Sequence, residues 1–285
     1  MKFEELVEEY KGKGTYDALL SYSGGKDSTY TLSLIREQYG LNILAVTLDN
    51  GFLPEQTITN IKNVVDKLSV DHIFFKPSFD SLKKIFKACA EKNIYPPTTL
   101  TRASTICTAC MAIVKFGSLR TALEKNIPFI IFGWSPGQIP VSSSVMKNNS
   151  QIVKMMQKSL YEPLHELVGE NIDPYFLEKE HFKKKYNFPF NISPLVFLDY
   201  DEKEILEKAR KLGWSRPKGI DANTTNCLLN SYANVIHKEH YGFHPYAFEM
   251  AKLVREGYLD RSVALEKLTQ PEDLTTIQSV KKKLK

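Results

Sequence analysis

The segment YDALLSYSGGKDS, residues 16–28, constrains the fold of this chain more than any other part of the sequence. Its apolar first half is typical of a buried strand over residues 17–22, and two adjacent glycines then predict a tight turn. A helix is expected to begin at Lys26. N–H groups at a helix start point outward and carry a partial positive charge, so this strand, turn and helix together suit a phosphate. The residues expected to bind phosphates are Ser21, Ser23, Gly24, Gly25, Lys26, Asp27 and Ser28.

The pattern SGGKDS lacks the G-x-x-x-x-G-K-[ST] spacing of the common P-loop. After a first strand it resembles the PP-loop of the ATP pyrophosphatases, also called adenine nucleotide α-hydrolases. The resemblance implies that ATP adenylates an acceptor, that pyrophosphate leaves, and that a sulfur or nitrogen nucleophile displaces AMP. It implies that Lys26 stabilises the pyrophosphate charge with Mg²⁺, and that Asp27 positions the loop or the metal. The alternative is an ordinary glycine-rich turn with a chance lysine.

Hydrophobic periodicity predicts an α/β fold in which strands alternate with helices. The strands are expected at residues 17–22, 43–48, 71–76, 127–133 and 195–198. The helices are expected at 3–10, 29–39, 57–68, 81–92, 107–125, 150–167, 175–185 and 202–212, then after Cys227, at 245–256 and at 262–268. Short links between strand and helix require parallel pairing with right-handed crossovers. The prediction is a five-stranded, doubly wound parallel sheet of the PP-loop type with a small C-terminal helical appendage.

The same patterns divide the chain into three regions. They are an N-terminal helix at residues 1–15, a PP-loop ATP pyrophosphatase domain at 16–213 and a helical region at 214–285. Residues 141–193 interrupt the strand–helix alternation and are interpreted as an insertion in the second region. The terminal KKKLK is expected to be solvated disorder.

Ligands of doubly wound sheets gather at the carboxyl ends of the strands. Asp49 and Gly133 follow the second and fourth expected strands. The PP-loop resemblance implies that Leu48 and Asp49 contact the adenosine and that Gly133 faces the nucleotide. Asp49 also fits a turn, because Asn and Gly follow it.

The four cysteines fall into two classes. Cys89 lies on the apolar face of an expected helix and is interpreted as a core residue. Cys107 and Cys110 form a C-x-x-C pair at a helix start, where the dipole is expected to lower the pKa of their thiols, and Cys227 follows the last strand–helix unit. Both loops are expected to converge near the nucleotide.

This cysteine arrangement resembles that of the iron–sulfur tRNA thiolases of the PP-loop superfamily. The resemblance implies a [4Fe–4S] cluster on Cys107, Cys110 and Cys227, with one iron open to a sulfur donor, and therefore sulfur transfer or sulfur removal. Lys115 matches the basic residue after the cysteine pair, which steers an anionic intermediate, but a solvated lysine is the alternative. A structural zinc, a redox pair and three unconnected thiols also stay open.

The overall layout resembles a second branch, the N-acetyl-sugar amidotransferases. The resemblance rests on YDALLSYSGGKDSTY, on LVREGYLDRSVALEKL and on the helical C-terminal region. It implies ammonia transfer to a sugar, with the ammonia supplied by a separate glutaminase subunit.

Charge and hydropathy limit the classes of acceptor and partner that are expected for this protein. The net charge of +5 comes from 38 basic and 33 acidic residues, and four of the lysines lie in the terminal KKKLK. The rest is nearly neutral, which gives no support for tRNA as a partner but does not exclude it. The acceptor is expected to be a small molecule or a nucleoside. No apolar run is expected to reach the roughly 20 residues of a membrane span, and no secretory signal is apparent. We therefore expect a cytoplasmic enzyme without membrane contact, with a homodimer possible through the appended helices.

Overall fold

Six strands form one sheet in the order β3-β2-β1-β4-β6-β5, and the computed structural model describes residues 3–101, 103–183 and 186–285. The strands are β1 (Ala18–Ser21), β2 (Ile43–Leu48), β3 (Asp71–Phe75), β4 (Phe129–Phe132), β5 (Val145–Lys147) and β6 (Phe190–Ile192). All neighbours pair in parallel except β5, which is antiparallel to β6. The chain leaves β1 towards β2 on one side and β4 lies on the other. The carboxyl end of β1 is therefore the switch point where such sheets bind ligands.

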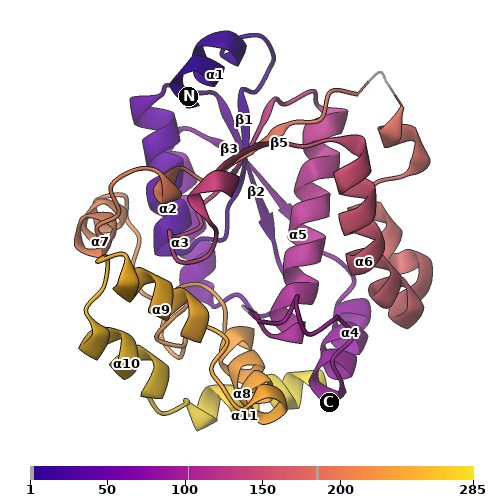
Figure 1. Cartoon of the computed structure of the whole chain (residues 1–285), viewed down its shortest axis with the longest axis vertical. Helices are drawn as coiled ribbons and strands as arrows, with labels where there is room; N and C mark the ends of the chain where they lie inside the picture. Colours follow the sequence, from indigo (N-terminus) through magenta and orange to yellow (C-terminus); the bar gives the residue numbers. More distant parts are fainter. Residues whose placement is uncertain (1–2, 102, 184–185) are drawn as a thin grey trace.

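Helices cover both faces of the sheet, with α2 and α3 on one side and α5 and α6 on the other (Figure 1). The α-helices are α1 (Phe3–Tyr10), α2 (Lys26–Ser33), α3 (Glu55–Leu68), α4 (Phe79–Glu91), α5 (Thr105–Glu124), α6 (Ser150–Val168), α7 (Glu202–Lys211), α8 (Leu229–Tyr241), α9 (Ala247–Arg255), α10 (Arg261–Thr269) and α11 (Leu274–Leu284). A π-helical turn, Leu34–Gln38, continues α2. Helices α8 to α11 gather at the end of the molecule opposite α1 (Figure 1).

Two hydrophobic cores lie on opposite faces of the sheet, because successive strand residues alternate between the faces. In β1, Leu19 packs with α4, α5, α6, α8 and α11, whereas Ala18 and Leu20 pack with α1, α2, α3 and α7. Strands buried on both faces read as continuous apolar runs, which is why the sequence predicts them well. The expected α/β class and the four strands up to residue 133 are confirmed.

The position expected for the fifth strand was wrong. Residues 195–198 form no strand, and a short 3₁₀ segment, Pro194–Val196, lies there instead. The fifth parallel strand is β6, which ends two residues before Pro194, a residue that cannot donate a ladder hydrogen bond. The sheet also gains antiparallel β5 inside the segment interpreted as an insertion, so it has six strands in the described part of the chain.

The helix expected at 175–185 was also wrong. Two 3₁₀ segments, Gly169–Tyr175 and Lys179–Phe182, lie there, and residues 184–185 fall outside the described part. Between the two segments Phe176 is extended and fully buried, stacked on Phe116 with ring centroids 5.1 Å apart. We attribute the break to this packing, which is more favourable than continuing an amphipathic helix at the surface.

The terminal lysines are not disordered, because they belong to α11. Ile277, Val280 and Leu284 are buried on one face of this helix and pack in the core beneath α8. Asp273 caps the helix by accepting from the N–H groups of Thr275 and Thr276. The spacing i, i+3, i+7 of the apolar residues predicts such a helix and outweighs the charge run.

Helix α5 corrects the expectation that no segment resembles a membrane span. It is 20 residues long, with a mean hydropathy of 1.4 over its most apolar window. By length and composition alone, this helix is long and apolar enough to cross a membrane. More than half of that window, 56%, is buried within the fold. Its apolar character follows from its place between the sheet and helices α4, α6 and α8.

Candidate active site at the carboxyl edge of the sheet

Residues 23–25, here called the glycine turn, connect β1 to α2. Gly24 has φ +74°, and a Cβ there would lie 2.7 Å from Ile61 Cγ1, so the turn depends on glycine at this position. The N–H of Gly25 donates to Ser23 Oγ at 3.3 Å, and the N–H of Lys26 donates to Thr225 Oγ1 at 3.1 Å. The donors expected to hold a phosphate are therefore present, and hydroxyl groups accept from them.

A loop from the C-terminal region closes on the glycine turn. Trp214 Nε1 donates to the carbonyl of Gly24 at 3.0 Å, and Asn226 Nδ2 donates to the carbonyl of Ser23 at 3.1 Å. With Thr225, these residues hold the turn from a distance of about 200 positions in the chain. The sequence analysis missed all three, and the polar run NTTN before Cys227 was the signal available.

Lys26 is buried and forms an ion pair with Asp27, which is partly exposed. Lys26 Nζ lies 2.8 Å from Asp27 Oδ1, 3.4 Å from Glu202 Oε1 and 3.2 Å from Tyr200 Oη. Burial opposes the charge of the lysine, but the acidic neighbours prevail and raise its pKa. These four side chains line one pocket with Glu249, here called the Lys26 pocket. The side chains of Lys26 and Asp27 line this pocket, and Ser21 and Ser23 line two other cavities on the same glycine turn.

The residues expected at the ends of β2 and β4 differ in what they contact. Leu48 lines the cavity described next, whereas Asp49 pairs with Lys76 at 2.8 Å and accepts from the N–H of Gly51. Asp49 therefore serves a turn and an ion pair. A Cβ on Gly133 would lie 2.7 Å from Ser28 Cα, so glycine there lets β4 pack against the start of α2.

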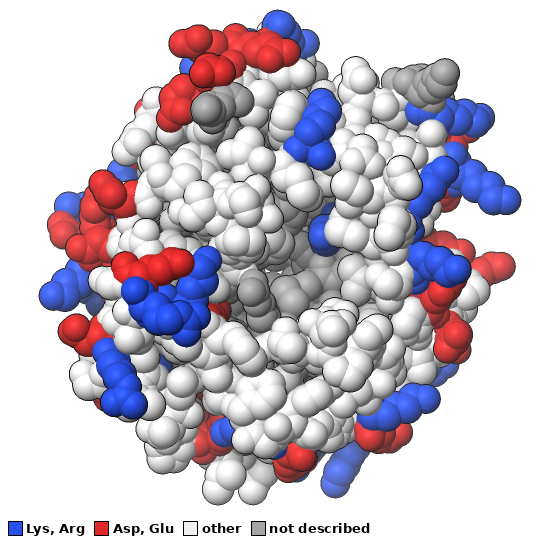
Figure 2. Space-filling view, in the orientation of Figure 1, with Lys and Arg blue, Asp and Glu red and all other residues white. Residues whose placement is uncertain are grey.

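One cavity of about 880 Å³, here called the thiol cavity, lies where β1, β2, the first turn of α5 and the loop before α8 meet. Its lining residues are Ser21, Tyr22, Ser23, Val46, Leu48, Asn50, Leu53, Cys107, Cys110, Met111, Val114, Thr224, Asn226, Cys227, Leu229, Asn230 and Tyr246. The structure thus brings two of the expected phosphate-binding serines and all three expected metal ligands together. None of these lining side chains is an ordinary cation or carboxylate. Figure 2 shows a hollow near the middle of one face, with mainly uncharged surface around it, blue atoms at its right edge and a mixed group of blue and red atoms to its left.

Two asparagines contact the three sulfur atoms. Asn50 Nδ2 lies 3.6 Å from Cys110 Sγ and 3.5 Å from Cys227 Sγ, and Asn230 Nδ2 lies 3.6 Å from Cys107 Sγ. Because one nitrogen atom joins Cys110 and Cys227, their sulfurs cannot be further apart than these two distances together. Both asparagines are buried, and both aim N–H donors at sulfur. The sequence analysis considered Asn50 only as part of a turn and missed Asn230.

The expectation of lowered thiol pKa values was wrong for the unliganded protein. Burial raises the pKa of Cys107 to about 11 and also raises the pKa of Cys227, and burial together with the neighbouring thiols raises the pKa of Cys110. Side-chain hydrogen bonds of the Cys107 sulfur with Ser104 and Asn230 oppose this effect without overcoming it. Thiolates at these positions therefore need a cation to be stable.

A second cavity, of about 1090 Å³ and here called the Lys115 cavity, adjoins the thiol cavity. Lys115 lines it together with Ser21, Ser23, Ser28, Cys110 and Gly133. Burial lowers the pKa of Lys115. Its Nζ donates to Met156 Sδ at 3.4 Å. Within the described ranges no carboxylate forms an ion pair with it, so its charge faces the cavity without a partner.

Glu249 is a further acid that the sequence analysis missed. It lines the Lys26 pocket and also a cavity of about 830 Å³ that contains Cys107, Asn230 and Tyr246. Ser135 Oγ donates to Glu249 Oε1 at 2.8 Å. Burial first, and the nearby Asp27 carboxylate second, raise the pKa of Glu249 to about 7. Such a group can exchange a proton near neutral pH.

Comparison with known proteins supports the expected superfamily. Residues 17–134 match the family model of the phosphoadenosine phosphosulfate reductase domain. The match covers less than half of the chain. The glycine turn, Gly133 and the cysteine pair of α5 all lie within the matched residues.

Relatives of the whole chain are more distant. An uncharacterized protein of Methanocaldococcus jannaschii is 25% identical over 271 residues, covering 94% of this chain and 78% of the relative. Among solved structures, the U34-tRNA thiolase NcsA of Methanococcus maripaludis with its [4Fe–4S] cluster is 17% identical, with a TM-score of 0.41, and the match covers 95% of this chain and 84% of that one. The NMN synthetase of Francisella tularensis is 14% identical, with a TM-score of 0.43 and coverage of 99% and 94%. At these TM-scores neither structure carries an argument about the activity of this protein.

Proposed function

We propose that this protein uses ATP to adenylate a small-molecule or nucleoside acceptor, releases pyrophosphate, and then transfers sulfur with the help of a [4Fe–4S] cluster on Cys107, Cys110 and Cys227. The observation that supports the proposal is the shared thiol cavity, which Ser21 and Ser23 line together with the three cysteines. A sulfur donor at the cysteines and an acceptor adenylated at the serines would then lie in the same cavity.

The PP-loop supplies the phosphate site in this proposal. The N–H groups of Gly25 and Lys26 donate to the hydroxyls of Ser23 and Thr225, and a phosphate oxygen would replace or join these hydroxyls. Asp27, held by Lys26 at 2.8 Å, is the carboxylate placed to bind Mg²⁺ beside the phosphates. Lys26 and Mg²⁺ would then share the negative charge that develops on pyrophosphate.

Lys115 is the cation for the reacting end of the nucleotide. Its ammonium group faces a cavity that contains PP-loop serines and Cys110, and its charge has no acidic partner there. An anionic phosphate would supply that partner, and the attraction is strong because the site is shielded from water. Lys115 therefore binds the α-phosphate of the adenylated acceptor in this proposal.

The residues of the thiol cavity fit an iron–sulfur cluster. They offer three soft donors, amide N–H groups aimed at the sulfurs, and no other cation in the lining to balance three thiolates. When bound, a cluster with three protein ligands supplies one open iron for a sulfur donor. Asn50 and Asn230 would orient the cysteines and tune the cluster through N–H···S contacts.

The charge distribution favours a small acceptor. In Figure 2 the surface around the hollow is mostly uncharged, and basic and acidic residues are mixed at the rim. A tRNA acceptor would require a continuous basic surface beside the site. We therefore propose a small-molecule or nucleoside acceptor.

Anaerobic iron and sulfide analysis tests the sulfur chemistry. The wild type is expected to be brown and to hold close to four irons per chain after reconstitution, and Cys227→Ala is expected to lose them. Cys89→Ala is the matched control, because Cys89 is buried in α4 and lies outside the thiol cavity. Equal iron in Cys227→Ala and wild type would overturn the cluster. A colourless wild type that co-purifies with a glutaminase would favour ammonia transfer.

Pyrophosphate release tests the nucleotide chemistry separately. ATP cleavage between the α and β phosphates is expected to fall by at least a hundredfold in Asp27→Ala and Lys26→Ala, while thermal unfolding reports whether the ion pair is needed for folding. Wild-type cleavage in a folded Asp27→Ala would remove its role. Phosphoadenosine phosphosulfate, added as a competitor, shows whether the site also accepts the nucleotide for which the matched family is named.

A further inference from the structure

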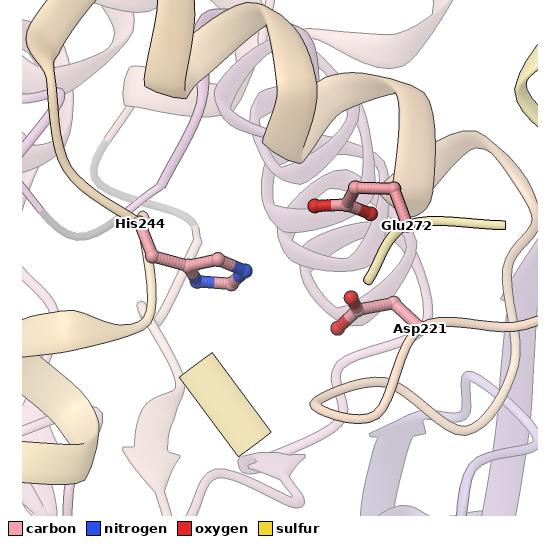
Figure 3. Close-up of side chains that lie close together, drawn as sticks. All are labelled: Asp221, His244 and Glu272. Carbon is pink, nitrogen blue, oxygen red and sulfur yellow. The ribbon is translucent and has the colours of Figure 1, made fainter. Parts of the chain in front are cut away.

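Three side chains that could bind a metal ion meet in the C-terminal region, outside the proposed active site. They are Asp221 in the loop between α7 and α8, His244 between α8 and α9, and Glu272 between α10 and α11 (Figure 3). One ligand atom of each lies within 4.8 Å of the others. In Figure 3 the imidazole of His244 points towards the two carboxylates.

His244 has a nitrogen available for an ion. The side chain is buried, with 8% of its surface exposed. Its Nδ1 accepts from the N–H of Tyr246 at 3.2 Å, which fixes the ring. In the described part of the chain its Nε2 has no hydrogen-bond partner, so this nitrogen is available to a ligand.

Each carboxylate is also held through one oxygen. Asp221 Oδ1 accepts from the backbone N–H of Asn223 at 2.8 Å and from its side chain at 3.1 Å. Glu272 Oε1 accepts from Lys238 Nζ. No hydrogen bond within the described ranges joins His244 to either acid, although both are near. Supporting contacts that fix ligand side chains and leave one atom of each free are typical of metal sites.

We propose that Asp221, His244 and Glu272 bind a divalent transition-metal ion, with Zn²⁺ as the expected metal. One imidazole and two carboxylates suit Zn²⁺, which binds nitrogen at about 2.0–2.1 Å and oxygen at about 2.0–2.2 Å. A small inward movement of the three side chains reaches these distances. Mg²⁺ is disfavoured because it prefers oxygen ligands alone.

The ion would stabilise the loop that completes the PP-loop. Asp221 lies four residues before Thr225 and six before Cys227, and both of these residues belong to the proposed active site. Hydrogen bonds already join this loop to α10 and α11, because Asn223 Nδ2 donates to the carbonyl of Lys267 at 3.1 Å and Thr276 Oγ1 donates to the carbonyl of Gly219 at 3.0 Å. A metal bound to all three side chains would add to these contacts and would also join the loop to the α8–α9 linker.

Metal binding to the full chain tests this proposal, with the cysteine site removed so that thiols cannot contribute. The background is Cys107→Ser with Cys110→Ser and Cys227→Ser, stripped of metal. We expect it to bind one equivalent of Co²⁺ without the sulfur-to-metal charge-transfer bands of thiolate ligation. Zn²⁺ is expected to displace this Co²⁺ and to raise the unfolding temperature.

Single variants in this background identify the ligands. Asp221→Asn and Glu272→Gln keep shape and hydrogen bonding, and each is expected to weaken Zn²⁺ affinity at least tenfold. His240→Gln is the matched control, because His240 is exposed in the same region and outside the group, and it should bind as the background does. Unchanged affinity in Asp221→Asn and Glu272→Gln would overturn the proposal. The proposal would also be overturned if Zn²⁺ did not change the unfolding temperature of the background protein. This second test does not depend on whether the ligand variants fold.

Discussion

Glu249→Gln is expected to change how stability depends on pH, because Glu249 is the buried acid with a pKa raised to about 7. Its ordinary value is 4.5. Between these values the folded protein keeps a proton that the unfolded chain releases, so the free energy of unfolding falls as pH rises. The stabilisation is fully present below pH 4.5 and is lost as pH passes about 7. The difference corresponds to about 3 kcal/mol, of which about 2.5 kcal/mol falls between pH 5 and pH 8.

Glutamine removes the titration and keeps the shape. Its carbonyl oxygen can still accept from Ser135, so the hydrogen bond at 2.8 Å is retained. Glu249→Gln is therefore expected to be close to wild type at pH 5 and more stable than wild type by about 2.5 kcal/mol at pH 8.

Urea unfolding at pH 5, 6, 7 and 8 measures this difference, since groups that titrate equally in both proteins cancel. Glu256→Gln, at the end of the same helix, is the control and should change stability by no more than roughly 0.5 kcal/mol. A stability difference between Glu249→Gln and wild type that stays constant with pH, or that favours wild type at pH 8, would refute the assignment of a buried, protonated carboxyl.

Three further predictions follow from packing and charge. Gly133→Ala places a Cβ 2.7 Å from Ser28 Cα, so it should displace the start of α2 and weaken binding of an ATP analogue in calorimetry. Ile277→Ala should destabilise the protein by about 3 kcal/mol in urea unfolding, because Ile277 is 5% exposed. Lys115→Met should raise the KM for ATP about tenfold and leave folding intact, whereas exposed Lys125→Met should not affect it.

Much of the fold was predictable because the central strands are buried on both faces. Residues such as Leu19 and Leu20 face different cores, so apolar runs mark the strands without ambiguity. The last strands were not predictable in the same way. β6 has three residues, and its position depends on pairing with β4 and on Pro194, which is a tertiary effect.

In the candidate site, too, some residues were predictable from the sequence and others were not. Local pattern marks the PP-loop and the C-x-x-C pair, because each occupies a few neighbouring residues. Pattern does not show that Thr225 accepts from the N–H of Lys26, that Asn50 contacts two sulfurs, or that Glu249 lies beside Asp27. These contacts join residues that are far apart in the chain. Burial also reversed the expected pKa of the thiols, because desolvation exceeds the effect of a helix N-terminus.

The closure of Trp214, Thr225 and Asn226 on the glycine turn has a consequence for protein synthesis. The turn is translated among the first 30 residues, but the residues that hold it leave the ribosome much later. Until then the nascent chain presents β1 and α2 without their supporting loop, so we expect nucleotide binding to require synthesis at least as far as Asn226. A fragment that ends at residue 134, where the family match ends, should for the same reason fail to retain ATP.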